Sequence, residues 1–556
     1  MLDRLLSRAA QDDLLRQIQS ANGGVLTSLH GSSASLIAAL LYSHNPLQTL
    51  IVAPKLDDAE ELAQDLATLL PGTPVLLFPE FEILPYEKRS PYKGITGQQV
   101  EVLHRVLSDE SCLVVTSAKG LKWKVQPPEE ILDYTIRFAV GGDIDYEATV
   151  ERFGAMGYYA VARVESPGDF ARKGGILDIF SVSYENPVRL ELLGDTIESI
   201  RFFDATTQRS LEPTEAVVVP PCSPLILSDA SVRRAVDALR ACTHGSEQER
   251  ERLADHVRER LHFDGMERLA PYYAPRVMLT DFFLDARRML WVRPEAVVEQ
   301  LRRLDSEIHK LYEDCVRGGQ PVPEPDAVYA PNARLHDLPS QLPTLFLTDV
   351  HWGGPPLGKL LAHDEAPASA AEPHLEIDDA TGRQLEAPGS ARHDAASTSV
   401  PGTRLAIQSP GSHGGRVAEL QRDLEHRMLL GQRIHIFCDN PGQAERLREL
   451  LDDIADRIDF PVGELQTGFV LVEQNVVVLT DREIFQRYKR RQRRRKYRIS
   501  QGISAYEELV PGDFVVHVQY GVARYMGIQS IQVEGADIDC LQLAFAGGDK
   551  RSEGVV

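Results

Sequence analysis

The chain has 556 residues and a mass of 61.9 kDa, which is too long for a single hydrophobic core and predicts three to five domains. Hydrophobic residues make up 43% and charged residues 26%, an ordinary globular composition that excludes a fibrous or wholly disordered chain. The formal net charge of -22 makes the surface as a whole repel nucleic acid and anionic membranes, so any DNA contact must be local.

The first part of the chain has the rhythm of a parallel sheet with crossover helices. Its predicted strands and helices alternate at 25–29, 32–43, 50–53, 56–70, 75–78 and 113–116. Later helical patterns at 229–240 and 248–261 precede another predicted buried strand at 344–347. We assign residues 1–118 and 214–350 to one α/β domain. Between them, at 119–213, the pattern changes to strands at 176–180, 188–193 and 199–203 around a helix near 146–156, which predicts an inserted α+β domain.

The middle of the chain loses all periodicity. Residues 351–403 are dominated by Pro, Ala, Ser, Gly and acidic residues, which cannot bury enough apolar surface to offset their ordering entropy, so we predict a disordered linker. Residues 404–482 again alternate between strand and helix and predict a second, small α/β domain. Its expected helices and strands lie at 415–430, 433–437, 443–454 and 476–479.

A basic segment at 483–503 separates this domain from the C-terminal part. Nine of the twelve residues at 487–498 are Lys or Arg, with Tyr488 and Tyr497 interleaved. Such a run can neutralise phosphates and stack on bases, but a solvated helix between domains explains it equally well. The candidate DNA-binding residues are Arg490, Arg491, Arg493, Arg494 and Arg495. Beyond it, short strands around regularly spaced glycines predict a small β-barrel at 504–556.

The sequence does not contain a recognisable catalytic motif. The turn after the first predicted strand, where an α/β domain would hold a phosphate, reads LHGSSAS at 29–35, without the Lys for the phosphates or the following Ser/Thr for magnesium. A Gly-Ser-Ser helix cap is the simpler interpretation. The His residues lack metal-ligand spacing, and there is no G-x-S-x-G elbow. We therefore expect no catalytic residue, no metal and no bound ATP.

Cysteine usage and hydropathy favour a cytoplasmic protein. The six cysteines are scattered singly, without the spacing of a zinc site or a disulfide framework. Residues 1–21 are rich in Arg and Asp and differ from a signal peptide. No apolar run approaches the roughly 18 residues that a membrane span needs, so we expect no membrane partner.

Three segments resemble bacterial transcription-repair coupling factors. Residues 78–91, FPEFEILPYEKRSP, resemble the WETLPYD-x-x-SP segment of these factors and of the excinuclease protein UvrB. Residues 167–210 resemble the inserted domain with which both families bind the excinuclease protein UvrA. Residues 481–485, the basic run and 509–528 resemble the CarD-like domain that grips the β chain of RNA polymerase, a domain that UvrB lacks. The third resemblance decides between the two families.

The resemblance implies an adaptor in transcription-coupled nucleotide excision repair that recruits UvrA to stalled RNA polymerase. Residues 1–118 and 214–350 would then be a UvrB-like domain without its phosphate loop. The family's motor, an ATP-dependent DNA translocase that uses magnesium, would lie beyond Val556, and we expect the C-terminal barrel to be incomplete. Two alternatives stay open: a divergent nucleotide-dependent helicase of the UvrB type, or an inactive truncated gene product.

The resemblance also implies particular contact residues. In the family, UvrA is contacted by a basic residue at the position of Lys173, an Arg at Arg189 and an aromatic at Leu193. Lys for Arg loses bidentate geometry and Leu for an aromatic removes an anchor, so we expect weaker binding here. The corresponding polymerase contacts are Arg524, Tyr525 and Ile531.

We expect Ile531→Arg to abolish polymerase binding and leave the fold intact, because a charge would replace an apolar contact. A pull-down in which the folded variant still retained polymerase would contradict this role.

Overall fold

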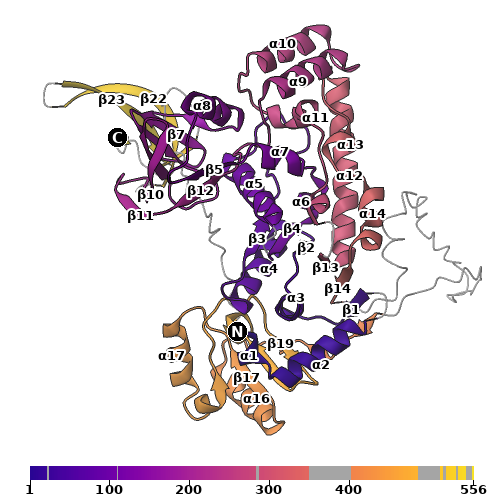
Figure 1. Cartoon of the computed structure of the whole chain (residues 1–556). Helices are drawn as coiled ribbons and strands as arrows, with labels where there is room; N and C mark the ends of the chain where they lie inside the picture. The colour runs from indigo at the N-terminus through magenta and orange to yellow at the C-terminus, as the bar shows by residue number, and fades with distance from the viewer. Residues whose placement is uncertain are drawn as a thin grey trace, which may run out of the picture. The chain divides into compact units, whose positions relative to one another are not determined.

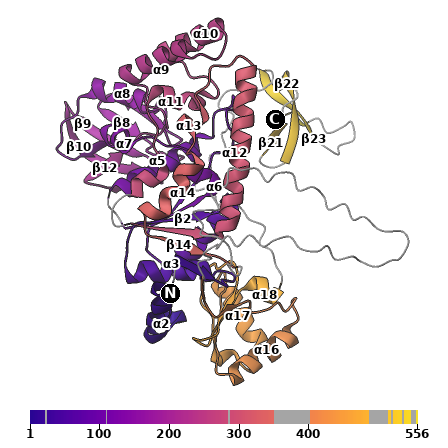
Figure 2. The same cartoon turned by 90° about the vertical axis from the view of Figure 1, so that its right-hand side faces the viewer.

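The computed structural model describes residues 1–21, 24–108, 111–283, 287–349, 402–485, 514–517, 521–533, 536–545 and 554–555. The chain forms two compact units, Met1–Arg491 and Gln492–Val556. Figures 1 and 2 show the chain from two directions, and the architecture is multidomain α/β as predicted.

A seven-stranded parallel sheet lies at the centre of the first unit, in the order β15-β1-β14-β13-β2-β4-β3. Except for β15, its strands are mostly apolar, as expected for a parallel sheet with helices on both faces. The strands of this sheet are β1 Val25–Thr27, β2 Thr49–Ala53, β3 Val75–Phe78, β4 Leu113–Ser117, β13 Arg288–Val292, β14 Thr344–Leu347 and β15 Thr403–Arg404. The parallel sheet predicted from the sequence is therefore confirmed.

Alternate residues of β2 divide between the two cores of this domain. Ile51 packs with helices α3 (Ser33–His44) and α4 (Leu56–Leu69) on one face of the sheet, whereas Leu50 and Val52 are buried in the core on the opposite face. The helices on that second face are α5 Lys93–Leu107, α6 Ala118–Lys122, α7 Pro128–Asp133, α12 Pro294–Arg317 and α14 Asn332–Gln341.

A helical layer continues the first domain. It consists of α9 Asp229–Ala241, α10 Glu247–Arg258, η2 Met266–Leu269 and α11 Ala270–Tyr273, which share their own core. Ser228 and Ser246 cap α9 and α10, because each side chain accepts a hydrogen bond from a backbone N–H of the first turn. The short elements η3 Leu279–Phe283 and α13 Pro325–Val328 complete this part.

The inserted domain has a six-stranded sheet in the order β11-β10-β9-β8-β7-β6. Its elements are α8 Tyr146–Ala155, β6 Tyr159–Ala160, β7 Asp169–Lys173, β8 Ile176–Ile179, β9 Val188–Leu193, β10 Thr196–Phe203 and β11 Ser210–Pro213. A separate pair, β5 Ile136–Ala139 and β12 Ala216–Val219, joins the same core.

The boundaries of the inserted domain differ from the predicted 119–213. Leu121 and Ile131 are buried in the core of the first domain, so 119–131 belongs there. Val217 and Val219 pack with Phe138 in the inserted core, which extends that domain to the end of β12. The sequence pattern misplaced both ends because α6 and α7 are short and β12 lies beyond a polar turn.

The second α/β domain has a five-stranded sheet in the order β16-β19-β20-β17-β18. Its elements are β16 Ile407–Gln408, α16 Val417–Leu429, β17 Arg433–Ile436, α17 Pro441–Leu450, η4 Ala455–Arg457, β18 Ile458–Asp459, β19 Phe469–Leu471, β20 Val476–Leu479 and α18 Asp481–Phe485. The predicted boundary at 404 is too early, because β15 pairs with β1 in the first sheet and the second sheet begins at β16. Most of the predicted linker, 351–401, lies outside the described residues.

Two N-terminal helices, α1 Leu2–Leu5 and α2 Arg8–Gln19, lie against both α/β domains (Figure 1). Arg4 forms an ion pair with Asp459, and Gln17 donates to Glu473 at 2.6 Å. Leu6 and Leu14 share one buried cluster with Leu36 of α3 and with β19.

The second unit contains four antiparallel strands in the order β21-β22-β23-β24. They are β21 Phe514–His517, β22 Gly521–Val533, β23 Ala536–Phe545 and β24 Gly554–Val555. The predicted strand-rich character is confirmed, and closure into a barrel stays a prediction. The basic run at 487–498 lies outside the described residues. Among the helices that the structure describes, none has the length and apolarity needed to cross a membrane.

Candidate protein-binding face of the inserted domain

The six-stranded sheet of the inserted domain has one buried face and one partly open face. On β9, Val188 and Leu190 point into the core beneath α8, together with Phe153 of that helix. Because successive side chains of a strand point to opposite faces, Arg189 and Leu193 lie on the other face. This second face is the candidate site.

The strand register brings the three predicted contact residues onto this face. Lys173 pairs with Ile176, which pairs with Glu191 on β9. Glu191 therefore shares a face with Lys173, and Arg189 and Leu193 lie two residues to either side of it on the same strand. The structure thus places Lys173, Arg189 and Leu193 together, while their role in binding stays a prediction.

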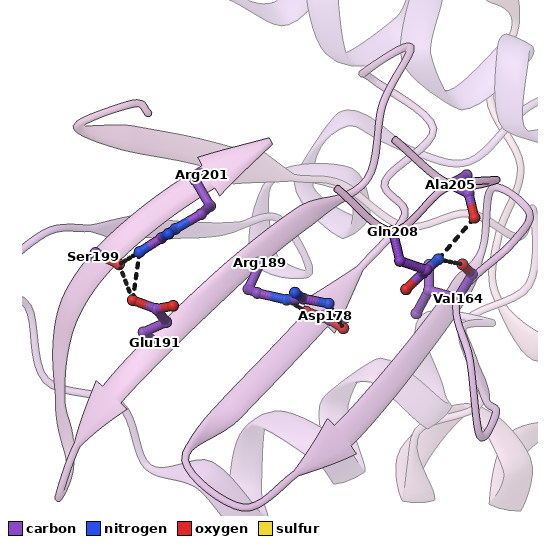
Figure 3. A network of polar contacts seen from close by, with 8 residues as sticks. All are labelled: Val164, Asp178, Arg189, Glu191, Ser199, Arg201, Ala205 and Gln208. Carbon is purple, nitrogen blue, oxygen red and sulfur yellow. Dashed lines mark hydrogen bonds and ion pairs between the residues drawn. The ribbon is translucent and has the colours of Figure 1, made fainter. Parts of the chain in front are cut away.

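Arg189 is held within the chain by two contacts. Its Nε and Nη2 donate to the two carboxylate oxygens of Asp178 at 2.7 and 2.8 Å (Figure 3). Its guanidinium lies 4.7 Å from the centre of the buried Phe203 ring. The hydrogen bond to Asp178 raises the pKa of Arg189 above its ordinary value. Asp178 therefore already engages the Nε side of the guanidinium of Arg189, and the Nη1 side remains for a partner.

A second charged cluster lies beside this pair. Arg201 is directly opposite Arg189 in the sheet and donates to Glu191 at 2.6 Å. Ser199 donates to the same carboxylate oxygen at 2.7 Å (Figure 3). Each arginine thus has its own carboxylate, which offsets the repulsion expected between like charges on directly opposed positions. Sequence reasoning missed this cluster, although the spacing of two residues between Arg189 and Glu191 on β9, and between Ser199 and Arg201 on β10, places them on the open face.

Leu193 is the apolar feature of this face. Its side chain is 73% exposed at the end of β9, next to the turn at Gly194. Lys173 is also exposed, at the end of β7. An exposed leucine beside charged groups suits a contact that is covered when a partner binds.

The predicted polymerase-contact residues are only partly described. Arg524 is exposed on β22, whereas the neighbouring Tyr525 is 3% exposed. The roles of Arg524 and Tyr525 in polymerase binding stay predictions. Ile531 pairs with Ile538 in the β22–β23 hairpin. The five candidate DNA-binding arginines lie outside the described residues.

The turn that resembles a degenerate phosphate loop is covered by the second α/β domain. Ser32 occupies the N-cap position of α3, but its side chain makes no capping hydrogen bond, so this part of the cap prediction is wrong. Its Oγ instead accepts a hydrogen bond from the backbone N–H of Thr467 at 3.1 Å. Within the described residues there is also no cluster of His, Cys, Asp and Glu that could hold a metal ion.

A buried carboxylate lies next to this contact. Asp65 of α4 accepts hydrogen bonds from Ser35 and from the backbone N–H of Gln466, both at 2.9 Å. Burial, which outweighs these hydrogen bonds, raises the pKa of Asp65 to about 7.

Asp65 should make stability depend on pH. Because its pKa is raised on folding, the folded state binds the proton more tightly, and stability falls as pH rises through about 7. We expect the free energy of unfolding to be about 1 kcal/mol higher at pH 6 than at pH 8 from this group. Chemical denaturation of the wild type and of Asp65→Asn at both pH values isolates the contribution of Asp65. The contributions of other titrating groups, such as His435, are the same in both proteins and cancel in the comparison. An equal pH dependence in both proteins would contradict the assignment.

Two family models match parts of the chain. Residues 136–224 match the UvrB interaction domain, and residues 509–551 match the CarD-like/TRCF RID domain. The first match contains the whole candidate face and agrees with the domain limits seen in the structure. The fold and these two matches define a multidomain α/β protein that combines both modules.

Curated relatives carry the name transcription-repair-coupling factor. The protein from Myxococcus xanthus is 30% identical over 565 residues, and that from Bacillus subtilis is 24% identical over 557 residues. These alignments cover 96% and 95% of this chain and 44% of each relative, so the chain spans less than half the length of the curated relatives it matches. The chain is therefore similar to transcription-repair-coupling factors over nearly its whole length, and the two matched modules lie within it.

Proposed function

We propose that the chain is a two-headed adaptor of transcription-coupled nucleotide excision repair in the cytoplasm. The inserted domain binds the excinuclease protein UvrA, and the C-terminal unit binds RNA polymerase through its β chain. The observation that carries the proposal is the open face of the inserted sheet, on which Lys173, Arg189 and Leu193 lie together within the matched domain. The second family match supports the polymerase contact.

We propose that the adaptor role of this chain involves neither binding nor hydrolysis of ATP. The turn at 29–35 lacks the phosphate-binding Lys, and Thr467 of the second α/β domain contacts it. The family's translocase activity would therefore need a motor outside the 556 residues. We expect the affinity for UvrA to be the same with and without ATP, and a titration showing ATP-dependent affinity would contradict this.

The test is a parallel pull-down of purified chain with RNA polymerase and with UvrA. We expect the wild type to retain both. Leu193→Glu should weaken UvrA binding by about tenfold or more and keep polymerase, because it places a charge on the exposed apolar contact.

The matched control is Leu429→Glu, since Leu429 is 84% exposed on α16, away from the inserted domain. This variant should bind both partners like the wild type. Unchanged UvrA binding by Leu193→Glu would contradict the proposal that the candidate face binds UvrA.

A further inference from the structure

The second α/β domain is matched by neither family model, yet it makes a specific contact with the first domain. The contact is at the N-terminus of α3, the end of a helix where backbone N–H groups are free to bind an anion. The N–H of Ser32 donates to the carbonyl oxygen of Thr467 at 3.2 Å, and the N–H of Thr467 donates to Ser32 Oγ at 3.1 Å. This reciprocal pair of hydrogen bonds satisfies the backbone N–H of Ser32, a donor that would bind the phosphate in a phosphate-binding turn.

Gly31 lies very close to the backbone of the second α/β domain. Its φ of +57° suits glycine, and a Cβ at this position would lie 2.3 Å from the carbonyl oxygen of Gly468. The backbone of 467–468 therefore packs directly on the turn.

The contact extends along α4. The N–H of Gln466 donates to the buried Asp65, and Thr68 Oγ1 donates to the carbonyl oxygen of Glu464 at 2.7 Å. Leu465 lies within the loop 464–468 and Phe469 follows it, and both are buried in the same cluster as Leu36 of α3. Polar and apolar contacts thus alternate along a continuous interface.

We propose that the second α/β domain is a fixed cap of the first, in which the loop 464–468 occupies the phosphate-binding position at the N-terminus of α3. The cap excludes nucleotides from the N-terminus of α3 and joins the two α/β domains into one body. This function is independent of the binding of UvrA or polymerase.

Hydrogen exchange of the full chain tests the cap. In the wild type, the N–H groups of Gln466 and Thr467 should be protected, because they donate to Asp65 and Ser32. Gly31→Ala should speed their exchange about tenfold or more, since the added Cβ would displace the loop. Gly72→Ala is the matched control, with φ of +84° and nothing within 4 Å of its Cβ, and it should leave the exchange unchanged.

Ser32→Ala is a milder second variant in case Gly31→Ala fails to fold. It removes the acceptor for Thr467 and the hydrogen bond between Ser32 and Asp65, so exchange should rise at the Thr467 N–H and stay slow in β17 and β20. Unchanged protection of 466–467 in both folded variants would overturn the proposal. Binding of pyrophosphate to the wild type with faster exchange at 466–467 would also overturn it, because the loop would then be a displaceable gate.

Discussion

Lys122→Met is expected to lower the free energy of unfolding by about 3 kcal/mol. Lys122 lies at the end of α6 with 1% of its side chain exposed, and its ammonium donates to Asp305 at 2.6 Å and to Asn332 at 2.7 Å. Methionine keeps the apolar stem but leaves these two acceptors without their shared donor. The loss falls at the lower end of the range for buried ion pairs because Asp305 is 29% exposed and keeps part of its hydration.

The double variant Lys122→Met with Asp305→Leu should recover much of this loss, because replacing both partners of a buried pair by apolar groups is often nearly neutral. Lys173→Met, at an exposed lysine, is the control and should change stability by less than about 0.5 kcal/mol. Chemical denaturation measures all three. A Lys122→Met protein as stable as the wild type would show that the ammonium adds nothing to the packing of α6 on α12 and α14.

Five strands of the first sheet could be predicted closely because each is an apolar run bounded by polar residues, whereas the apolar strand β13 was missed. The strand predicted at 75–78 is β3 in the structure, and the helix predicted at 56–70 is α4 with one residue fewer. The two-residue strand β15 could not be predicted, since two residues show no periodicity. Its pairing with β1 is decided by tertiary contacts alone.

The candidate face was predictable only in part. The family resemblance supplied Lys173, Arg189 and Leu193, and the alternation along β9 put the last two on one face. The partner of Arg189 required the register of β8 against β9, because Asp178 lies eleven residues earlier in the chain. The contact between Ser32 and Thr467 spans 435 residues, and nothing in the local sequence indicates it.

Arg189→Met is expected to weaken binding of UvrA by about a hundredfold, the size of an interface hot spot. Methionine still covers Phe203, so the loss would come from the guanidinium, whose Nη1 side is left for a partner when Asp178 holds Nε and Nη2. The same change leaves Asp178, only 12% exposed, without its cation, which should cost about 3 kcal/mol of stability.

Adding Asp178→Asn to Arg189→Met separates these two effects. The double variant should regain most of the stability, because the unpaired charge is gone, yet it should bind UvrA as weakly as Arg189→Met. Asp178→Asn alone should weaken binding about tenfold, since the guanidinium loses the pair that orients it. Titration calorimetry and chemical denaturation of the four proteins measure both quantities. If Asp178→Asn instead tightened binding, Asp178 would compete with UvrA for the guanidinium of Arg189. An acidic group of UvrA would then have to displace Asp178 from Arg189 for the complex to form.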